Sequence, residues 1–398
     1  MDFESAVAFL KKFNPYEDKG FPAYNEKNFN LDRLRRFLKA YKIGYQGLKY
    51  VHVTGSKGKS TSCLMMGNYL WKNGYKVGVF TSPYIIEITE CIWVNGRNIS
   101  KDQFVKYVFQ LRKFIANYKG PVLTYFEFLV AIVLQYFVDE KIDFAVMEVG
   151  LGGRLDATNV IDPEVAVLTT VEKEHTEILG KTYDKILNEK LGIVFGKKVK
   201  NLVIGYQNAY VSKLIRKKVG KGKRVIFVKN QSNKSLVSAA LQMLFKKVDE
   251  KLLNKIADDL KMIGRFDVRV VNGKNVVFDM AHTKNSVQVL LRNLKEKFSK
   301  KKWLFLVSIM KNKNVKDILV PICKIGKEVV VTSSNPERGY TAKQLKVLAA
   351  RMNYKVAAVE GFEAAYEKLI KKMGANNVLV VTGSHFLVGK VLSRFFGL

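Results

Sequence analysis

The sequence predicts an α/β protein with two domains, each built on a mostly parallel sheet that helices cover on both faces. Three observations lead to this prediction. The chain has 398 residues, more than the roughly 100–200 residues of an ordinary single domain. Short apolar segments alternate with helical stretches along most of the chain. These segments are hydrophobic at nearly every position, which is typical of strands buried on both faces of a parallel sheet.

The first part of the chain begins with a predicted helix and continues with five predicted strands. Leu31, Leu34 and Leu38 share one face of a helix in the segment LDRLRRFLKAY. A second helix is predicted from about residue 60 to 73, directly after the first strand. The predicted strands are 48–55, 75–81, 143–150, 164–171 and 200–205.

A second series of strands predicts a smaller, Rossmann-like α/β domain at the C-terminal end. A helical, lysine-rich stretch at 235–262 precedes it, so we expect two domains, 1–262 and 263–398. The predicted strands are 275–281, 302–308, 328–334, 354–360 and 376–383. Ligands of open α/β sheets bind at the carboxyl ends of the strands, so residues just after the strands are the first candidates for a site.

The composition is that of a globular protein, with 48% hydrophobic and 26% charged residues, which excludes a disordered chain, a collagen and a coiled coil. No apolar run reaches the roughly 18 residues of a membrane span. Acidic residues before the first short apolar run argue against a secretory signal. Cys63, Cys91 and Cys323 are scattered and lack metal-ligand spacing. We therefore expect a cytoplasmic protein without a membrane partner.

The net charge of +33 is the unusual quantity. A large positive excess suits anionic partners, which include phosphates, polycarboxylates and nucleic acids. The basic residues are mostly lysines and are spread along the whole chain. A solvated lysine-rich surface, an anionic small substrate and a nucleic-acid partner all remain open on this observation. The absence of a basic–aromatic module leads us to expect no nucleic-acid partner.

The segment GSKGKST at 55–61 follows the first predicted strand and opens a helix. Its two glycines allow a tight turn whose backbone N–H groups, together with the helix N-terminus, face an anion. Lys59 supplies a charge for the β- and γ-phosphates, and Ser60 or Thr61 a hydroxyl near a metal ion. The spacing is shorter than in the common P-loop, and an ordinary Gly/Ser turn is the alternative. The context favours nucleotide phosphate binding.

Oxygen-rich side chains follow three other predicted strands and are candidates for magnesium ligands, as hard cations prefer oxygen. They include Ser82 in TSP and Glu148 in EVGLGG, and His175 lies beside Glu174 in EHTE. Glu148 follows four apolar strand residues, a costly place for an unpaired carboxylate. A strand-end acid paired to a lysine is the alternative for Glu148, and a plain polar loop residue is the alternative for His175.

A third group lies near the domain boundary. Arg265 stands in GRF, and Asp279 and His282 follow the first strand of the second domain. Such residues would suit contacts to a nucleotide from the second domain, although this pattern alone favours a structural role.

Together these segments resemble the folylpolyglutamate synthases, Mur-ligase-like enzymes that are often also dihydrofolate synthases. The matching segments, in order, are GSKGKST, TSPY, EVGLGGRLDATNV, EHTEILG, EKLGI, GRF and DMAHT. The resemblance runs from about residue 45 to the C-terminus. It implies a Mur-ligase-like P-loop domain, followed by a Mur-ligase-type C-terminal domain. The implied activity is ATP- and Mg²⁺-dependent addition of L-glutamate to the side-chain carboxylate of (tetrahydro)folate through an acyl phosphate. A bifunctional enzyme that also joins glutamate to dihydropteroate is the alternative, and we expect a monomer.

The resemblance also assigns roles to residues. The implied catalytic residues are Lys59, His175, Lys190 and Arg265, with Lys190 carbamylated. The implied metal ligands are Ser82, Glu148, His175 and Lys190. The implied nucleotide contacts are Gly55, Ser56, Lys57, Gly58, Lys59, Ser60, Thr61, Asn233, Arg265, Asp279 and His282.

Several positions depart from the family pattern. Those in the matching motifs are Lys57, Ser60, Tyr84, Cys91, Glu174, Met280 and Thr283. They bear on substrate identity more than on ATP chemistry. Because bifunctional members often carry histidine at the Tyr84 position, this tyrosine favours glutamate addition to folate alone.

Overall fold

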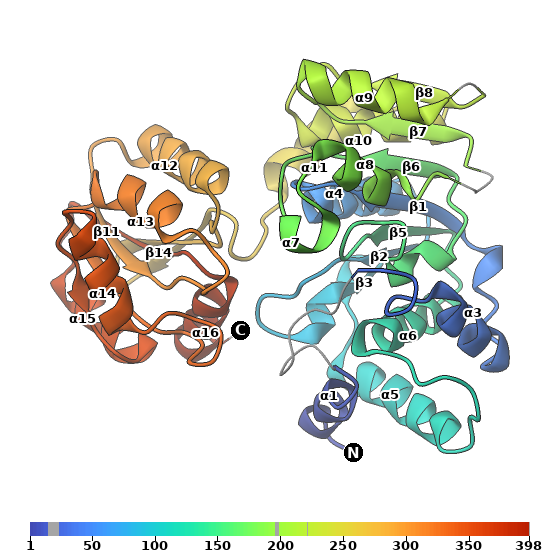
Figure 1. The fold of residues 1–398 in the computed structure, drawn as a ribbon, viewed down its shortest axis with the longest axis horizontal. Helices are drawn as coiled ribbons and strands as arrows, with labels where there is room; N and C mark the ends of the chain where they lie inside the picture. Colours follow the sequence, from blue (N-terminus) through green and yellow to red (C-terminus); the bar gives the residue numbers. More distant parts are fainter. Residues whose placement is uncertain (15–23, 196–198, 221, 398) are drawn as a thin grey trace. The chain divides into compact units, whose positions relative to one another are not determined.

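The computed structural model describes residues 1–14, 24–195, 199–220 and 222–397. The chain forms two compact units, Met1–Leu260 and Lys261–Leu398 (Figure 1). The structure thus divides after Leu260, whereas the sequence analysis places the boundary two residues later, after residue 262. The roles of the two units as an ATP-binding domain and a C-terminal ligase domain stay predictions at this point. No helix within the described ranges is both long and apolar enough to cross a membrane.

The first unit is built on an eight-stranded sheet with the strand order β4-β3-β2-β5-β1-β6-β7-β8. The strands are β1 (Lys49–Thr54), β2 (Val77–Phe80), β3 (Ile92–Val94), β4 (Arg97–Asn98), β5 (Phe144–Glu148), β6 (Val165–Leu168), β7 (Asn201–Ile204) and β8 (Arg224–Phe227). The five predicted strands, β1, β2, β5, β6 and β7, are confirmed and pair in parallel. Sequence reasoning missed β3, β4 and β8.

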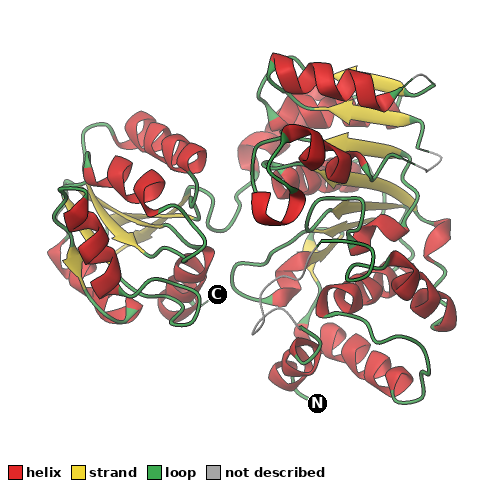
Figure 2. Cartoon of the chain, in the orientation of Figure 1, coloured by secondary structure: helices red, strands yellow, loops and turns green. Residues whose placement is uncertain are grey.

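The parallel strands bring their carboxyl ends to one edge of this sheet. Val53 of β1 pairs with Glu148 of β5, and Phe80 of β2 pairs with Met147. All five residues of β5 are buried, because helices cover both faces of the sheet (Figure 2). The loops after β1, β2 and β5 therefore leave the sheet side by side, and each carries a predicted site residue.

Helices on the two faces of the first sheet bury three separate cores. One core includes residues of α4, α10 and α11, another includes residues of α1, α3, α5 and α6, and a third includes residues of α7, α8 and α9. The helices are α1 (Phe3–Lys11), α3 (Leu31–Ala40), α4 (Lys59–Lys72), α5 (Lys101–Ile115), α6 (Tyr125–Asp139), α7 (Thr176–Leu179), α8 (Tyr183–Leu191), α9 (Ala209–Val219), α10 (Asn233–Leu244) and α11 (Glu250–Asp259). The two early predicted helices correspond to α3 and α4, and the helical stretch before the boundary to α10 and α11.

The second unit contains a six-stranded sheet with the order β13-β12-β11-β14-β10-β9. Its strands are β9 (Asp267–Val271), β10 (Lys274–Asp279), β11 (Lys302–Val307), β12 (Glu328–Val331), β13 (Ala357–Ala358) and β14 (Asn377–Thr382). Its helices are α12 (Lys284–Phe298), α13 (Val315–Cys323), α14 (Ala342–Arg351), α15 (Phe362–Lys372) and α16 (His385–Phe396). The five predicted strands pair in parallel, whereas β9, which was not predicted, adds antiparallel to β10.

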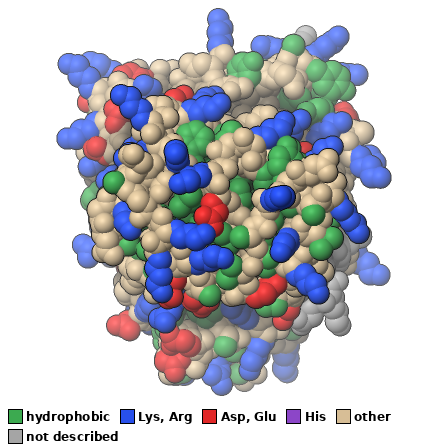
Figure 3. Space-filling model, turned by 90° about the vertical axis from the view of Figure 1, so that its left-hand side faces the viewer, with side chains coloured by type: hydrophobic (Ala, Val, Ile, Leu, Met, Phe, Trp, Pro, Cys, Tyr) green, Lys and Arg blue, Asp and Glu red, His purple; other side chains and the backbone are tan. Residues whose placement is uncertain are grey.

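The positive charge is dispersed over one face of the molecule. On the face drawn in Figure 3, lysine and arginine side chains are scattered among other residues and do not gather into one stripe. This distribution favours a solvated lysine-rich surface over a groove for a long polyanion.

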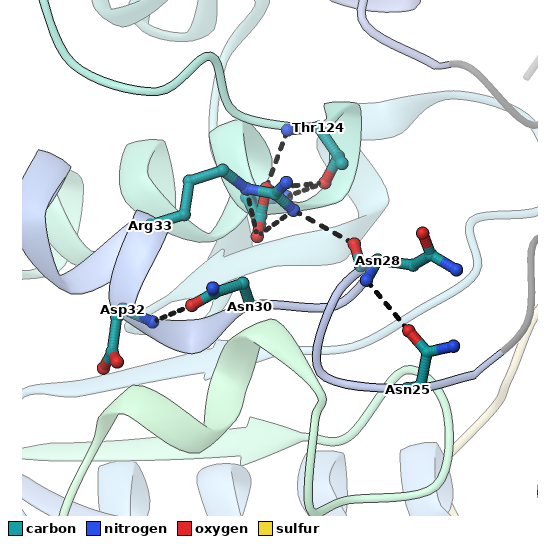
Figure 4. Close-up of polar contacts among 7 residues, drawn as sticks. Asn25, Asn28, Asn30, Asp32, Arg33 and Thr124 are labelled. Carbon is teal, nitrogen blue, oxygen red and sulfur yellow. Dashed lines mark hydrogen bonds and ion pairs between the residues drawn. The ribbon is translucent and has the colours of Figure 1, made fainter.

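A partly buried ion pair anchors the segment before β1 to α6. The guanidinium of Arg33 donates from Nη2 to Glu127 at 2.8 Å and to the carbonyl oxygen of Asn28 at 3.5 Å (Figure 4). Glu127 also accepts the backbone N–H of Thr124, the N-cap residue of α6, at 2.7 Å. The exposed fractions of the Arg33 and Glu127 side chains are 19% and 8%. Removal of either partner therefore leaves a charge with little access to water.

We predict that Arg33→Met lowers the free energy of unfolding by about 2–4 kcal/mol, since it leaves the Glu127 carboxylate without its cation. Chemical denaturation followed by circular dichroism measures this loss. The matched control is Arg35→Met, which removes an ion pair to Asp32 whose side chains are 46% and 69% exposed. Exposed pairs contribute about 0–1 kcal/mol. Equal losses in the two variants would contradict the prediction.

Candidate active site

The glycine-rich loop between β1 and α4 has no space for side chains at two positions. A Cβ on Gly55 would collide with the side chain of Thr169, and a Cβ on Gly58 with the carboxamide of Asn233. Gly58 also has a left-handed backbone with φ +80°, a conformation that glycine adopts at little cost. The predicted loop geometry is confirmed in this respect, and the loop lies directly beside Asn233 at the start of α10.

Glu148, the last residue of β5, is 1% exposed and is held by one group from the first turn of α4 and one from the loop after β2. The Ser60 hydroxyl donates to its Oε1 at 3.1 Å, and the Ser82 backbone N–H donates to its Oε2 at 3.2 Å. Lys59 Nζ lies 3.9 Å from Oε1 and donates to the carbonyl oxygen of Gly55 at 3.2 Å. The structure therefore also agrees with the alternative that Glu148 is a strand-end acid near a lysine, and this lysine is Lys59 of the glycine-rich loop.

The outer part of the loop is fixed by the segment after β6. The Ser56 N–H donates to the Thr170 carbonyl oxygen at 2.7 Å, and the Ser56 hydroxyl accepts the Glu172 N–H at 2.9 Å. Lys57 pairs with the Glu172 carboxylate at 3.0 Å. The side-chain hydroxyls of Thr169 and Thr170 are buried here without a hydrogen-bond partner. These two hydroxyl groups beside the loop are thus available to a bound ligand.

Lys190, in the last turn of α8, is 2% exposed. Its Nζ lies 3.2 Å from Glu174 Oε1. Burial lowers the pKa of Lys190 to about 8, against the opposing effect of Glu174, and the positive charge of Lys59 lowers it further. The structure thus brings Lys190 close to the glycine-rich loop, with an amine that loses its proton more easily than an exposed lysine.

His175 immediately precedes α7 and has a left-handed backbone with φ 47°. It is exposed and adjacent in sequence to Glu174, the partner of Lys190. Within the described residues, no group of three or more His, Cys, Asp or Glu side chains is arranged to hold a metal ion by itself. The predicted set contains only two residues of these types, Glu148 and His175, so a metal would also depend on other oxygen ligands.

The oxygen atoms at this site would suit magnesium as ligands. They belong to the Glu148 carboxylate and the Ser60 hydroxyl, and further hydroxyl groups lie close to the loop. Magnesium prefers hard oxygen ligands and commonly takes one or two protein carboxylates together with phosphate and water. Sulfur and imidazole ligands, which suit zinc, do not cluster within the described part of the chain.

In the second unit, Asp279 is held at the end of β10 by two backbone N–H groups. Phe266 donates to Oδ2 at 2.8 Å and Ala281 to Oδ1 at 2.9 Å. Burial raises the pKa of Asp279 to about 6, although these hydrogen bonds and the charge of Arg265 act in the opposite direction. His282 lies three residues after Asp279, with Nδ1 2.8 Å from the Met280 carbonyl oxygen. The three predicted residues of this unit therefore lie close together.

Sequence reasoning missed further cations beside His282. Burial lowers the pKa of His385 to about 4, and the charges of His282, Lys313 and Arg338 add to this effect. Lys313, Arg338 and His385 follow the ends of β11, β12 and β14 respectively. A comparison of every strand end in the second series would have found them. Lys313 and Arg338 therefore place positive charge near two histidines, His282 and His385, at one edge of the sheet, and such a site suits a carboxylate or phosphate.

The sequence matches two family models. The Mur ligase middle domain matches residues 53–272, and the Mur ligase glutamate ligase domain matches residues 264–385. Together they span both units of the structure.

Two bacterial relatives match over almost their whole length. A dihydrofolate synthase/folylpolyglutamate synthase of Buchnera aphidicola subsp. Schizaphis graminum is 30% identical, covering 98% of this chain and 96% of the relative. The enzyme of the same name from Bacillus subtilis is 26% identical, covering 96% and 99%.

Solved structures have the same fold. A folylpolyglutamate synthase from Thermotoga maritima superposes with a TM-score of 0.78 at 26% identity, covering 98% of this chain and 97% of that chain. A folylpolyglutamate synthase from Mycobacterium tuberculosis, complexed with ADP and AMPPCP, gives a TM-score of 0.85 at 22% identity, covering 99% of both chains. The glycine-rich loop, the buried glutamate beside it and the matches to both domains lead to one conclusion: the chain belongs to the folylpolyglutamate synthase/dihydrofolate synthase family of Mur ligases.

Proposed function

We propose that the protein is an ATP-dependent ligase that adds L-glutamate to the side-chain carboxylate of a folate through an acyl phosphate. The observation that carries this proposal is the convergence of Lys59, Glu148 and Lys190 beside a glycine-rich loop. The full-length relatives named dihydrofolate synthase/folylpolyglutamate synthase support the same activity.

In the proposed reaction, the folate carboxylate attacks the γ-phosphorus of ATP, and ADP leaves. The amine of the incoming glutamate, after losing a proton, then attacks the acyl carbon, and the amide forms as inorganic phosphate leaves. Phosphoryl transfer requires mainly positioning and charge neutralisation from the protein. A protein nucleophile is not required, in agreement with free cysteines of which Cys63 and Cys91 are buried.

The residues of the first unit would bind the phosphates. The N–H groups of residues 55–61 and the start of α4 would hold the phosphate oxygens, and Lys59 would neutralise charge on the β- and γ-phosphates. Ser60, Ser82, Glu148 and His175 would supply protein contacts for magnesium, which provides charge neutralisation on the transferring phosphoryl group when bound. Asn233 lies beside Gly58 and would contact the nucleotide.

Lys190 would act as a carbamate. Its neutral amine can add carbon dioxide and release a proton, which gives an anionic oxygen ligand in place of a cation. An unmodified ammonium, in addition to the charge of Lys59 that already acts on Lys190, would instead repel any cation bound there. The lowered pKa of Lys190 supports this proposal because it makes the neutral amine available near neutral pH.

The residues of the second unit would complete substrate binding. Arg265, Asp279 and His282 would contact the nucleotide or the reacting carboxylate. The cations around His385 would attract the carboxylates of incoming glutamate, since Lys313 and Arg338 contribute positive charge near it. Their position at the carboxyl ends of three strands agrees with where open α/β sheets bind ligands.

We further propose that the enzyme acts as a cytoplasmic monomer without nucleic-acid partners. The free cysteines agree with a reducing compartment. The scattered charges of the face in Figure 3 do not form a nucleic-acid groove there.

The test of the proposed function is glutamate-dependent release of ADP with a panel of folates and pterins. We expect release with a reduced folate and none with dihydropteroate, because Tyr84, which packs against a hydrophobic core, replaces the histidine common in bifunctional members. Dihydrofolate formed from dihydropteroate would establish the bifunctional alternative. ATP hydrolysis stimulated by DNA or RNA, with no glutamate dependence, would contradict the ligase.

We predict that Glu148→Gln raises the magnesium concentration needed for half-maximal activity by about tenfold or more, because the amide retains the shape but lacks the charge that binds the cation. Excess magnesium should restore part of the rate. Steady-state rates over a magnesium titration measure the effect. Glu164→Gln, at an exposed position before β6, is the control. An unchanged magnesium dependence would leave Glu148 only a structural role.

We predict that the carbamate on Lys190 increases as pH rises through about 8, since only the neutral amine reacts with carbon dioxide. The ¹³C NMR signal of the carbamate, at fixed dissolved ¹³CO₂, measures its occupancy. Lys190→Ala should remove the signal and nearly all activity, and a short carboxylic acid should recover some activity. Lys185→Ala, at an exposed position of the same helix, should change neither. A wild-type rate in Lys190→Ala would refute this role.

A further inference from the structure

Arg154 joins two segments that carry proposed site residues. One is the loop that leaves β5 directly after Glu148, and the other is the last turn of α8, which contains Lys190. These segments are far apart in sequence and approach each other at this arginine. The proposed function requires Glu148 and Lys190 to remain at a constant separation, so the link between the segments bears directly on it.

The backbones make close contact at this point. The Arg154 N–H donates to the Glu189 carbonyl oxygen at 2.7 Å. A Cβ on Gly153 would lie 2.9 Å from the carbonyl oxygens of Glu189 and Lys190, and a Cβ on Gly192 would collide with Arg154. The two glycines therefore allow an approach that other residues would prevent, and the loop lies directly on the turn that holds Lys190.

The side chain of Arg154 adds a second link. Its Nε lies 3.2 Å from both carboxylate oxygens of Glu189, and its Nη2 lies 3.1 Å from Oε1. Glu189 has a side chain only 14% exposed, whereas the Arg154 side chain is 38% exposed. A guanidinium that meets a carboxylate through two nitrogens fixes orientation as well as distance.

A third contact reaches the segment before α3. Arg154 Nη1 donates to Glu26 at 2.8 Å, but the Glu26 side chain is 79% exposed. Such an exposed ion pair contributes little energy. The two carboxylate partners of Arg154 therefore differ sharply in burial. A change at Glu26 can serve as the control for a change at Glu189, because both contact the same guanidinium.

We propose that Arg154 is a positioning residue for the ligase reaction, and that it acts by holding Glu189 so that Lys190 keeps its place relative to Glu148. This inference rests on the proposed function. Arg154 touches neither Lys190 Nζ nor Glu148 in any described contact of its side chain, so it would act through the backbone of α8. Its loss would misplace a proposed ligand without removing one, which lowers kcat more than it changes substrate affinity.

The experiment compares Arg154→Met, Glu189→Gln, the double variant and Glu26→Gln. We expect each of the first two to lower kcat about tenfold or more, with KM for folate and glutamate changed less than about threefold. The double variant should be no slower than the slower single variant, because both changes break one link. Glu26→Gln should stay within about twofold of the wild type.

A second measurement is independent of activity. Hydrogen–deuterium exchange of the protein without substrates should increase in residues 186–192 for Arg154→Met and Glu189→Gln and remain unchanged there for Glu26→Gln. If Arg154→Met fails to fold, Arg154→Lys serves instead. It retains the charge but not the two-nitrogen contact, and its kcat should fall between those of the wild type and Glu189→Gln.

The outcomes separate this inference from the proposed function. A wild-type protein that shows no glutamate-dependent ADP release with any folate would overturn the proposed function. An active wild type accompanied by wild-type kcat in Arg154→Met, or by an equal loss in Glu26→Gln, would overturn the role of Arg154 alone. Additive losses in the double variant would also refute it, since two independent contacts would then be at work.

Discussion

The buried carboxylate of Glu148 is the constraint on which the architecture of the first unit depends. Burial of an uncompensated charge costs several kcal/mol or more, and Glu148 is 1% exposed at the end of a fully buried strand. Its compensation comes from segments that follow two other strands: the Ser60 hydroxyl in the first turn of α4, after β1, and the Ser82 N–H after β2. These contacts exist only if β1, β2 and β5 are parallel and end at one edge. The parallel order of these strands is thus required for the polar contacts of Glu148.

Close backbone contacts extend this requirement outward. Gly55 and Gly58 let the loop lie against Thr169 and Asn233, and Gly153 lets the next loop lie against α8. A side chain at any of these positions would separate segments whose polar groups need to meet. The glycines thus set distances between elements, and the ion pairs of Lys59 and Arg154 add direction to contacts that the backbone has already made possible.

The fold was largely predictable from the sequence because buried parallel strands are apolar at almost every position. β3 and β4 were missed because they span only three and two residues. β9 was missed because Val270, near its end, is 67% exposed, so no buried run marks it. In the site, the loop residues follow a recognisable spacing. The ion pairs Arg33–Glu127, outside the site, and Arg154–Glu189 follow no recognisable sequence spacing, because each joins residues at least 35 positions apart.

The resemblance described above implies aspartate at the position of Glu174, so this residue is a departure that lies beside Lys190. The Glu174 carboxylate lies 3.2 Å from Lys190 Nζ. This contact favours the ammonium form, while burial and Lys59 favour the neutral amine. The two effects leave the pKa of Lys190 at about 8, between an exposed lysine and a permanently neutral one. Glu174 therefore competes with the proposed carbamate for Lys190. The consequence of glutamate at this position would therefore fall on how readily the proposed carbamate forms.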